Sequence, residues 1–235
     1  IAVQNLMNKH KNGYYLIASC IMSFLLQYIM LFEIIYLEMM NSSLFLLLYK
    51  RKNYQVIEKL NISTEELKNV LDYMFQCCKY GYDKAGVQAR QDDNIIHFFD
   101  RREMDHLNDI HSILKVCYCG LVMAAILFLL LAMLLHFKRK TRFFFKTFLW
   151  SEAIIAVVII AILILESNSM LGVVNTFHRM IFKNNRWVMN PVTDKMIYFF
   201  PVDLFKQLTV YIAIRIIIQW GVLSIFFMKK LKNSI

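Results

Sequence analysis

Four runs of apolar residues, each long enough to cross a lipid bilayer, constrain this chain more than any other feature. They lie at about 14–36, 116–136, 149–165 and 208–228. The first has no small-residue cleavage site, so we expect a retained helix and not a signal peptide. We predict an all-α polytopic membrane protein with four transmembrane helices, built as a single integral membrane domain over residues 1–235.

Basic residues predict the orientation of these helices. The formal net charge is +10, and many of the positive side chains flank apolar runs. They lie in the N-terminal tail, in the link FKRKTRFFFK between the second and third runs, and at the C-terminus. The positive-inside rule then makes both termini cytoplasmic. Residues 37–115 and 166–207 are predicted to be extracytoplasmic, and the charge does not indicate binding to nucleic acid.

The first extracytoplasmic segment contains NISTEELKNVLDYMF, residues 61–75. Ser63 followed by Glu66 is a capping box, and apolar residues follow at helical spacing, so a helix is predicted here. The rest of residues 37–95 is not assigned a fold. Cys77 and Cys78 are adjacent, and neighbouring cysteines pair only under strain, so we predict no disulfide framework.

Two charged residues interrupt the apolar runs near their predicted outer ends. Glu33 lies in the first run and Arg215 in the fourth. A charge inside a bilayer is expensive unless it is paired or reached by water. These residues therefore form either an ion pair that fixes two helices or a polar floor beneath a site that contacts substrate or lipid.

Four of the six histidines fall in the extracytoplasmic segments: His97, His106, His111 and His178. His106 and Asp109 are three residues apart and share one face of a predicted helix. A carboxylate beside an imidazole fixes its tautomer and raises its basicity, as a general base requires. The alternative is a solvated helix end with scattered charges.

A metal site is a further interpretation of the same histidines. His106, Asp109 and His111, with His178 from the second segment, are the possible ligands. Positions i and i+5 do not share a helical face, so this spacing is a poor match for a zinc motif. We therefore predict neither a metal nor a cofactor.

Two motifs resemble those of a known family. They are FFxxREMxHLxDI before the second apolar run and FHRMIFxNNRWxMNPxTDxxIYFFPxxxF before the fourth. Together with the four spans, they are similar to the bacterial lipoprotein intramolecular transacylase family, Lit. The resemblance implies an acyltransferase of the bacterial cell membrane whose two family histidines map onto His106 and His178.

The resemblance also implies the reaction and its partners. The substrate would be a diacylated lipoprotein, and the sn-2 acyl chain would move from glycerol to the α-amino group of its N-terminal cysteine. The product is a lyso-form lipoprotein, made on the extracytoplasmic face without a cofactor. One histidine would act as base and the other would stabilise the oxyanion, but the sequence does not distinguish the two roles or predict an oligomeric state.

Several other residues are candidates for supporting roles. Arg179, Asn190 and Asp194 are predicted to orient the site or to contact a head group, although the last two are also ordinary turn residues. Trp187 is predicted to anchor the segment at the depth of the acyl ester. Two alternatives stay open: a membrane metallohydrolase that uses the same histidines, and a non-enzymatic four-helix sensor or accessory protein.

Overall fold

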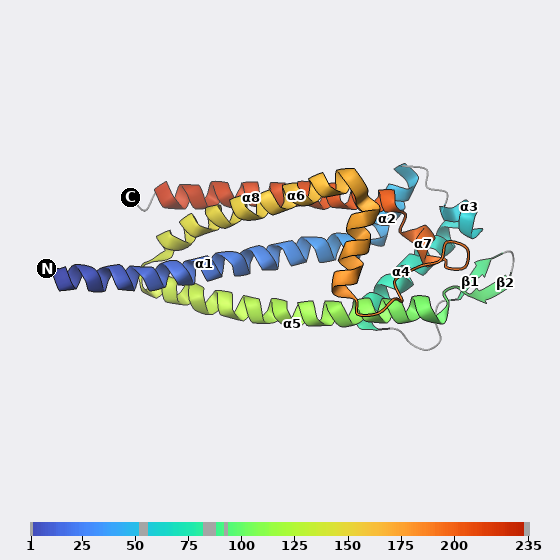
Figure 1. Ribbon diagram of the computed structural model, residues 1–235, viewed down its shortest axis with the longest axis horizontal. Helices are drawn as coiled ribbons and strands as arrows, with labels where there is room; N and C mark the ends of the chain where they lie inside the picture. Colours follow the sequence, from blue (N-terminus) through green and yellow to red (C-terminus); the bar gives the residue numbers. More distant parts are fainter. Residues whose placement is uncertain (1, 52–55, 82–87, 92–93, 233–235) are drawn as a thin grey trace. The chain divides into compact units, whose positions relative to one another are not determined.

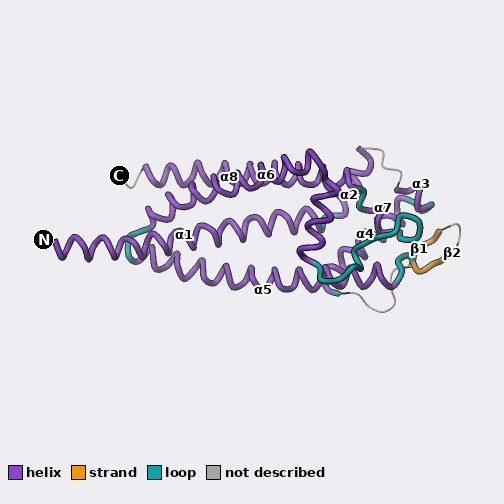
Figure 2. Tube along the Cα trace, in the orientation of Figure 1, coloured by secondary structure: helices purple, strands orange, loops and turns teal. Residues whose placement is uncertain are grey.

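The computed structural model describes residues 2–51, 56–81, 88–91 and 94–232. In chain order the elements are α1 (Ala2–Met39), α2 (Ser42–Arg51), α3 (Val56–Leu60), α4 (Thr64–Tyr80), β1 (Gln88–Gln91), β2 (Asn94–His97), α5 (Arg101–Phe137), α6 (Thr141–Ile181), α7 (Met196–Phe199) and α8 (Val202–Lys232). Most of the described residues are helical, and one short pair of strands lies between α4 and α5 in the chain (Figures 1 and 2).

Four helices are long and apolar enough to span a membrane, as the sequence predicts. They are Asn12–Met39, Arg101–Phe137, Thr141–Leu165 and Val202–Lys232. Each extends beyond its apolar run because polar turns continue the helix. About 20 residues suffice to cross a bilayer, so we place the spanning part of α5 at its apolar stretch, residues 116–136. The charged turns before that stretch lie outside the span.

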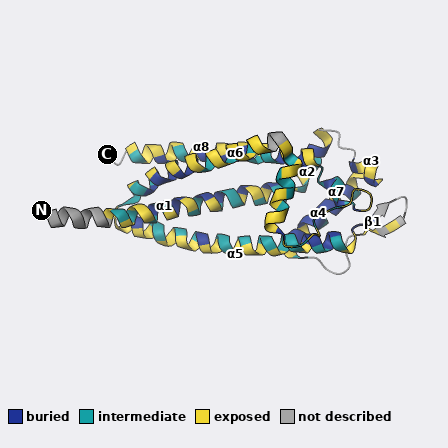
Figure 3. Cartoon of the chain, viewed as in Figure 1, coloured by how far each residue is buried: buried dark blue, intermediate teal, exposed yellow. Residues whose placement is uncertain are grey.

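The chain separates into two compact units, the first formed by residues 1–36, 119–163 and 211–235. Aromatic and aliphatic side chains from α1, α5, α6 and α8 fill its core. Exposed positions recur along the helices of this unit and are largely apolar, as expected for surfaces that face lipid (Figure 3). Small polar side chains join α1 to α6, with Ser23 and Thr147 hydroxyls 2.8 Å apart.

The second unit consists of residues 37–118 and 164–210. Its core consists of buried apolar side chains from α4, together with others from α2, α7 and the start of α5. The predicted helix start at Ser63 is confirmed, because Ser63 Oγ accepts a hydrogen bond from the Glu66 N–H at 3.1 Å and α4 begins at the next residue. Tyr49 donates from its hydroxyl to the Phe199 carbonyl at 2.6 Å, so α2 fixes α7.

A two-stranded antiparallel hairpin of β1 and β2 precedes α5, with Gln88 opposite His97. The sequence did not predict this hairpin in particular. It leads directly into Phe98 and Phe99, which are buried in the core of the second unit. The hairpin therefore ends where the chain turns into α5.

Candidate active site

His106 lies in the second turn of α5 and is almost fully buried, with 5% of its surface exposed. The neighbouring Glu103 and Leu107 are buried on the same part of the helix. The ring of Phe182 meets His106 edge-on, with the ring centroids 5.0 Å apart. This environment removes the imidazole from bulk water.

His178 lies on the last helical stretch of α6. Ser169 interrupts α6 with a non-helical backbone, and its Oγ accepts a hydrogen bond from the Gly172 N–H at 3.2 Å. Such a contact is typical of a helix N-cap, so a new helical stretch begins there and ends at Ile181. His178 Nδ1 lies 2.7 Å from the Val174 carbonyl oxygen one turn earlier.

The structure brings the two histidines together. Their ring centroids are 6.1 Å apart, and the rings are tilted by 34°. Phe182 contacts both, since it also stacks on His178 at 5.5 Å. Trp187 covers His178 with a centroid distance of 5.1 Å. Two histidines separated by more than seventy residues thus contact each other and the same phenylalanine ring.

Two polar atoms of this site are buried without a hydrogen-bond partner among the described residues. They are Nδ1 of His106 and the indole Nε1 of Trp187. A buried donor or acceptor without a partner costs about 1–3 kcal/mol, so such atoms are rare in folded proteins. Two of them beside one histidine pair indicate a place where a ligand supplies the missing partners.

Burial controls the protonation of His106, which precedes the spanning part of α5. Loss of water, and to a smaller extent the neighbouring His178, lower its pKa to about 4, while Asp109 acts in the opposite direction. His106 is therefore neutral at physiological pH. A neutral imidazole presents one donor and one acceptor nitrogen.

Asp109 does not orient His106 by a hydrogen bond, which corrects the prediction from their spacing. Its carboxylate accepts from Asn184 Nδ2 at 2.9 Å and from the Arg186 guanidinium at 3.0 Å. The two side chains share a helical face, but the loop after α6 supplies better donors than an imidazole. Asp109 thus ties that loop to α5 and influences His106 only through its charge.

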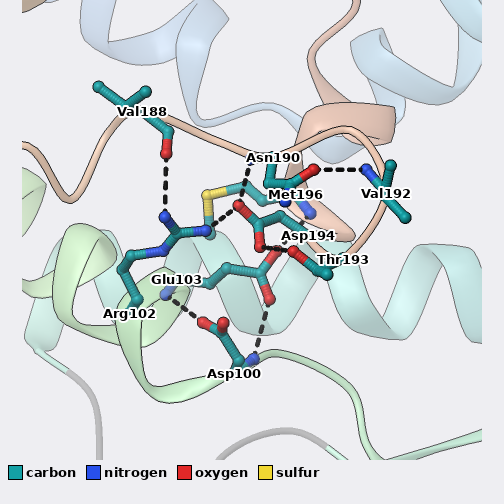
Figure 4. Close-up of polar contacts among 9 residues, drawn as sticks. All are labelled: Asp100, Arg102, Glu103, Val188, Asn190, Val192, Thr193, Asp194 and Met196. Atoms are coloured by element: carbon teal, nitrogen blue, oxygen red, sulfur yellow. Dashed lines mark hydrogen bonds and ion pairs between the residues drawn. The ribbon is translucent and has the colours of Figure 1, made fainter.

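A second polar cluster lies at the start of α5 (Figure 4). Asp100 and Glu103 form a reciprocal capping box, with hydrogen bonds of 2.7 and 2.8 Å between each backbone N–H and the other carboxylate. The second oxygen of Glu103 accepts from the Met196 N–H at 2.6 Å. Burial raises the pKa of Glu103, although these two N–H groups favour its charged form. The DxxE spacing is a signal for this cap in the sequence, but no cap was predicted from it.

Arg102 and Asp194 extend this cluster. The two form an ion pair, and Asp194 also accepts from the Asn190 N–H at 2.5 Å and the Thr193 hydroxyl at 2.8 Å. Burial opposes ionisation of Asp194, but these hydrogen bonds and the arginine outweigh it and lower its pKa. Arg102 donates from its other nitrogen to the Val188 carbonyl. Arg102 and Glu103 stand in the first motif, but the sequence assigned neither a role.

The other candidate residues are Asn190, Arg179, Glu33 and Arg215. Asn190 accepts from the Val192 N–H at 2.9 Å, in keeping with its interpretation as a turn residue. Arg179 is exposed and makes no hydrogen bond or ion pair among the described residues. Glu33 and Arg215 belong to the first unit, where both are exposed on their helices.

The remaining histidines of these segments have separate places. His111 Nδ1 lies 3.2 Å from the Cys78 carbonyl oxygen, next to Gly81, whose φ of 83° ends α4. His97 is exposed on β2. Within the part of the chain that the structure describes, no three His, Cys, Asp or Glu side chains could hold one metal ion. Cys77 and Cys78 are both buried, and neither is in a disulfide.

Comparisons with known proteins agree with the motifs. The family profile described as "Lipoprotein intramolecular transacylase Lit" matches residues 20–205. No curated protein sequence gave a match.

Solved structures of the lipoprotein intramolecular transacylase Lit from Bacillus cereus have the same fold. One matches with a TM-score of 0.76 and 15% identity over 94% of this chain and 99% of that one. A second, with one histidine replaced by arginine, matches with a TM-score of 0.72 and 15% identity over the whole of both chains. The profile spans most of the sequence, and the chain therefore belongs to the lipoprotein intramolecular transacylase family, Lit.

Proposed function

We propose that this protein transfers the sn-2 acyl chain of an S-diacylglyceryl lipoprotein to the α-amino group of its N-terminal cysteine, and that His106 and His178 perform the transfer. The observation that carries this proposal is the histidine pair itself. The centroids of the two imidazole rings are 6.1 Å apart. His106 Nδ1 and Trp187 Nε1 are buried and lack hydrogen-bond partners among the described residues. The family supplies the reaction class.

His178 is the better base of the two. A carbonyl oxygen can only accept, so Nδ1 of His178 carries the hydrogen that it donates to Val174. Its Nε2 then has a free lone pair. This tautomer suits removal of a proton from the substrate's neutral α-amino group as its nitrogen attacks the ester, and general base catalysis of this kind contributes about 10²–10⁴ in rate. The sequence alone left this choice open.

His106 suits the other role. Because burial keeps it neutral, it holds a proton weakly as a base but offers one N–H as a hydrogen-bond donor. A donor aimed at the developing oxyanion contributes about 10²–10³ in rate in comparable sites. We assign His106 to stabilisation of the tetrahedral intermediate.

The proposed chemistry needs no co-substrate. The α-amino nitrogen attacks the sn-2 ester carbon, a C–N bond forms, and the C–O bond to glycerol breaks. The proton that His178 takes from the amine returns to the glycerol oxygen. Acyl donor and acceptor are in one molecule, so positioning supplies much of the remaining rate.

The setting follows from the charge distribution. The basic flanks favour cytoplasmic termini, which supports an extracytoplasmic position for residues 37–115 and 166–207 in a bacterial cell membrane. Arg179 lies beside His178 in the sequence and exposes its charge, so it is available to a lipid or peptide group of the substrate. We retain Arg215 and Glu33 as lipid-facing contacts, since both are exposed on helices that span the membrane.

Mass spectrometry of one lipoprotein tests this proposal. The protein is produced in a host that lacks N-acylating enzymes, and the N-terminal lipopeptide is isolated. We expect the wild type to move one acyl chain from glycerol to the amine without a change in total mass. A peptide that keeps both chains on glycerol and a free amine, although the protein is present in the membrane, would refute the proposal.

A further inference from the structure

The indole N–H of Trp187 is the most informative group that the proposed mechanism does not use. Its Nε1 is buried, and no acceptor among the described residues lies within hydrogen-bond reach. Buried tryptophan N–H groups normally have a partner. The ring is held against His178 at a centroid distance of 5.1 Å, so the orphan donor lies within the candidate active site.

The chemistry of this donor restricts what can occupy the site. An indole N–H donates and cannot accept, and it does not ionise at physiological pH. The missing partner must therefore bring an oxygen or nitrogen acceptor. Phe182 stacks on His178 at 5.5 Å and contributes no polar atom to this site. The acyl ester carbonyl of the substrate is an acceptor that must approach His178 for the reaction to occur.

We propose that the Trp187 N–H is a second oxyanion donor, which acts with His106 on the carbonyl oxygen of the sn-2 ester. This inference rests on the proposed function and names a further catalytic residue for it. When the α-amino nitrogen attacks, the carbonyl π electrons move to oxygen, and the indole hydrogen bond strengthens without proton transfer. Collapse of the intermediate restores the carbonyl, and the glycerol oxygen leaves with the proton from His178.

The site geometry supports a paired arrangement. One orphan atom, Nδ1, is in the His106 ring, and the other, Nε1, is in the Trp187 ring, which contacts His178, while Phe182 contacts both histidine rings. Preorganised donors that gain strength only as charge develops raise kcat and leave ground-state binding nearly unchanged. The loop that carries Trp187 is tied to α5 through Asp109, which accepts hydrogen bonds from Asn184 and Arg186. A fixed loop is what preorganisation requires.

Replacement of the N–H without loss of the ring tests this role. Two variants serve: Trp187→Phe, and position 187 carrying benzothienylalanine, in which sulfur replaces the N–H. Turnover is measured with the purified protein and a synthetic diacylated lipopeptide. We expect kcat to fall about 10²–10³-fold in both variants. We expect KM to stay within about two-fold of the wild-type value, as for an interaction made in the transition state. The pH profile of kcat/KM should keep the shape that it has in the wild type.

Trp150→Phe is the matched control, because Trp150 is 73% exposed on α6 in the first unit. It should keep full turnover. If the benzothienylalanine variant keeps wild-type kcat, or if only its KM rises, Trp187 is not an oxyanion donor. If Trp187→Phe does not fold, the kcat of the benzothienylalanine variant alone tests the role of the indole N–H. Loss of turnover in His106→Ala and His178→Ala would then leave the proposed function standing, whereas full turnover in those histidine variants would overturn the function itself.

Discussion

Two polar clusters in the second unit differ in how completely they are satisfied. At the start of α5, Glu103 and Asp194 accept hydrogen bonds on both of their carboxylate oxygens (Figure 4). Around the histidine pair, His106 Nδ1 and Trp187 Nε1 are buried without a partner in the described part of the chain. Both clusters connect α5 with the segment after α6.

The difference in hydrogen bonding indicates that the first cluster stabilises the fold and that the second serves the reaction. A satisfied network fixes backbone and leaves no donor or acceptor for a substrate. An unsatisfied one costs stability and persists where a ligand completes it. We therefore expect changes in the first cluster to act mainly on stability and changes in the second to act mainly on turnover.

The largest expected effect is loss of turnover in the histidine variants. His178→Ala and His106→Ala should each lower kcat about 10²–10⁴-fold, because one removes the base and the other an oxyanion donor. Mass spectrometry of the lipopeptide product measures this. His97→Ala is the control, since His97 is exposed on β2, and it should keep wild-type turnover. Equal losses in all three variants would contradict the assignment.

The second effect is a loss of stability in mild acid. The pKa of His106 is about 4 when folded and near 6.5 when unfolded, so the unfolded chain takes up a proton first as the pH falls. Stability is then unaffected above pH 6.5 and declines between about pH 6.5 and 4, by up to about 3 kcal/mol. Thermal unfolding in detergent at pH 7 and pH 5 measures it.

The matched variant for this experiment is His106→Asn, which does not titrate in this range. Its unfolding temperature should fall less than that of the wild type between the two pH values. An identical pH dependence in both proteins would show that His106 is not the group responsible.

A smaller effect is expected when the satisfied cluster is broken. Asp194→Asn removes the charge that pairs with Arg102 and should destabilise the fold by about 1–3 kcal/mol. Asp72→Asn breaks the exposed Lys68–Asp72 pair and should cost about 0–1 kcal/mol. Thermal unfolding compares the two. If Asp194→Asn is as stable as Asp72→Asn, the network does not fix this loop.

The smallest effect is that of a chelator. The proposed mechanism uses only protein side chains and substrate atoms, so turnover after treatment with a chelator should equal that of untreated protein. A loss that added zinc restores would favour the metallohydrolase alternative. Metal content of the purified protein provides an independent measurement.

The sequence predicted the parts of this structure that depend on local patterns. The four spans follow from long apolar runs, and the start of α4 follows from the Ser63 and Glu66 spacing. His106 and His178 followed from the family motifs, and the structure brings them to one site. These features need only the residues of one segment or one motif.

Contacts between distant segments could not be predicted in the same way. Asp109 and His106 share a helical face, but Asn184 and Arg186 compete for the carboxylate from a loop about 75 residues later. The choice of base likewise depends on the carbonyl of Val174, which becomes available to His178 only in a helical stretch. Spacing in the sequence gives neither the competitor nor the backbone conformation.

The histidine pair is proposed to move an acyl chain within one substrate molecule. The most direct test uses purified protein in vesicles, with a lipopeptide whose sn-2 chain carries deuterium and with unlabelled phospholipid in excess. We predict a product in which the deuterated chain is on the α-amino nitrogen and the glycerol sn-2 position is free. An unlabelled chain on that nitrogen, or a free amine, would contradict the account.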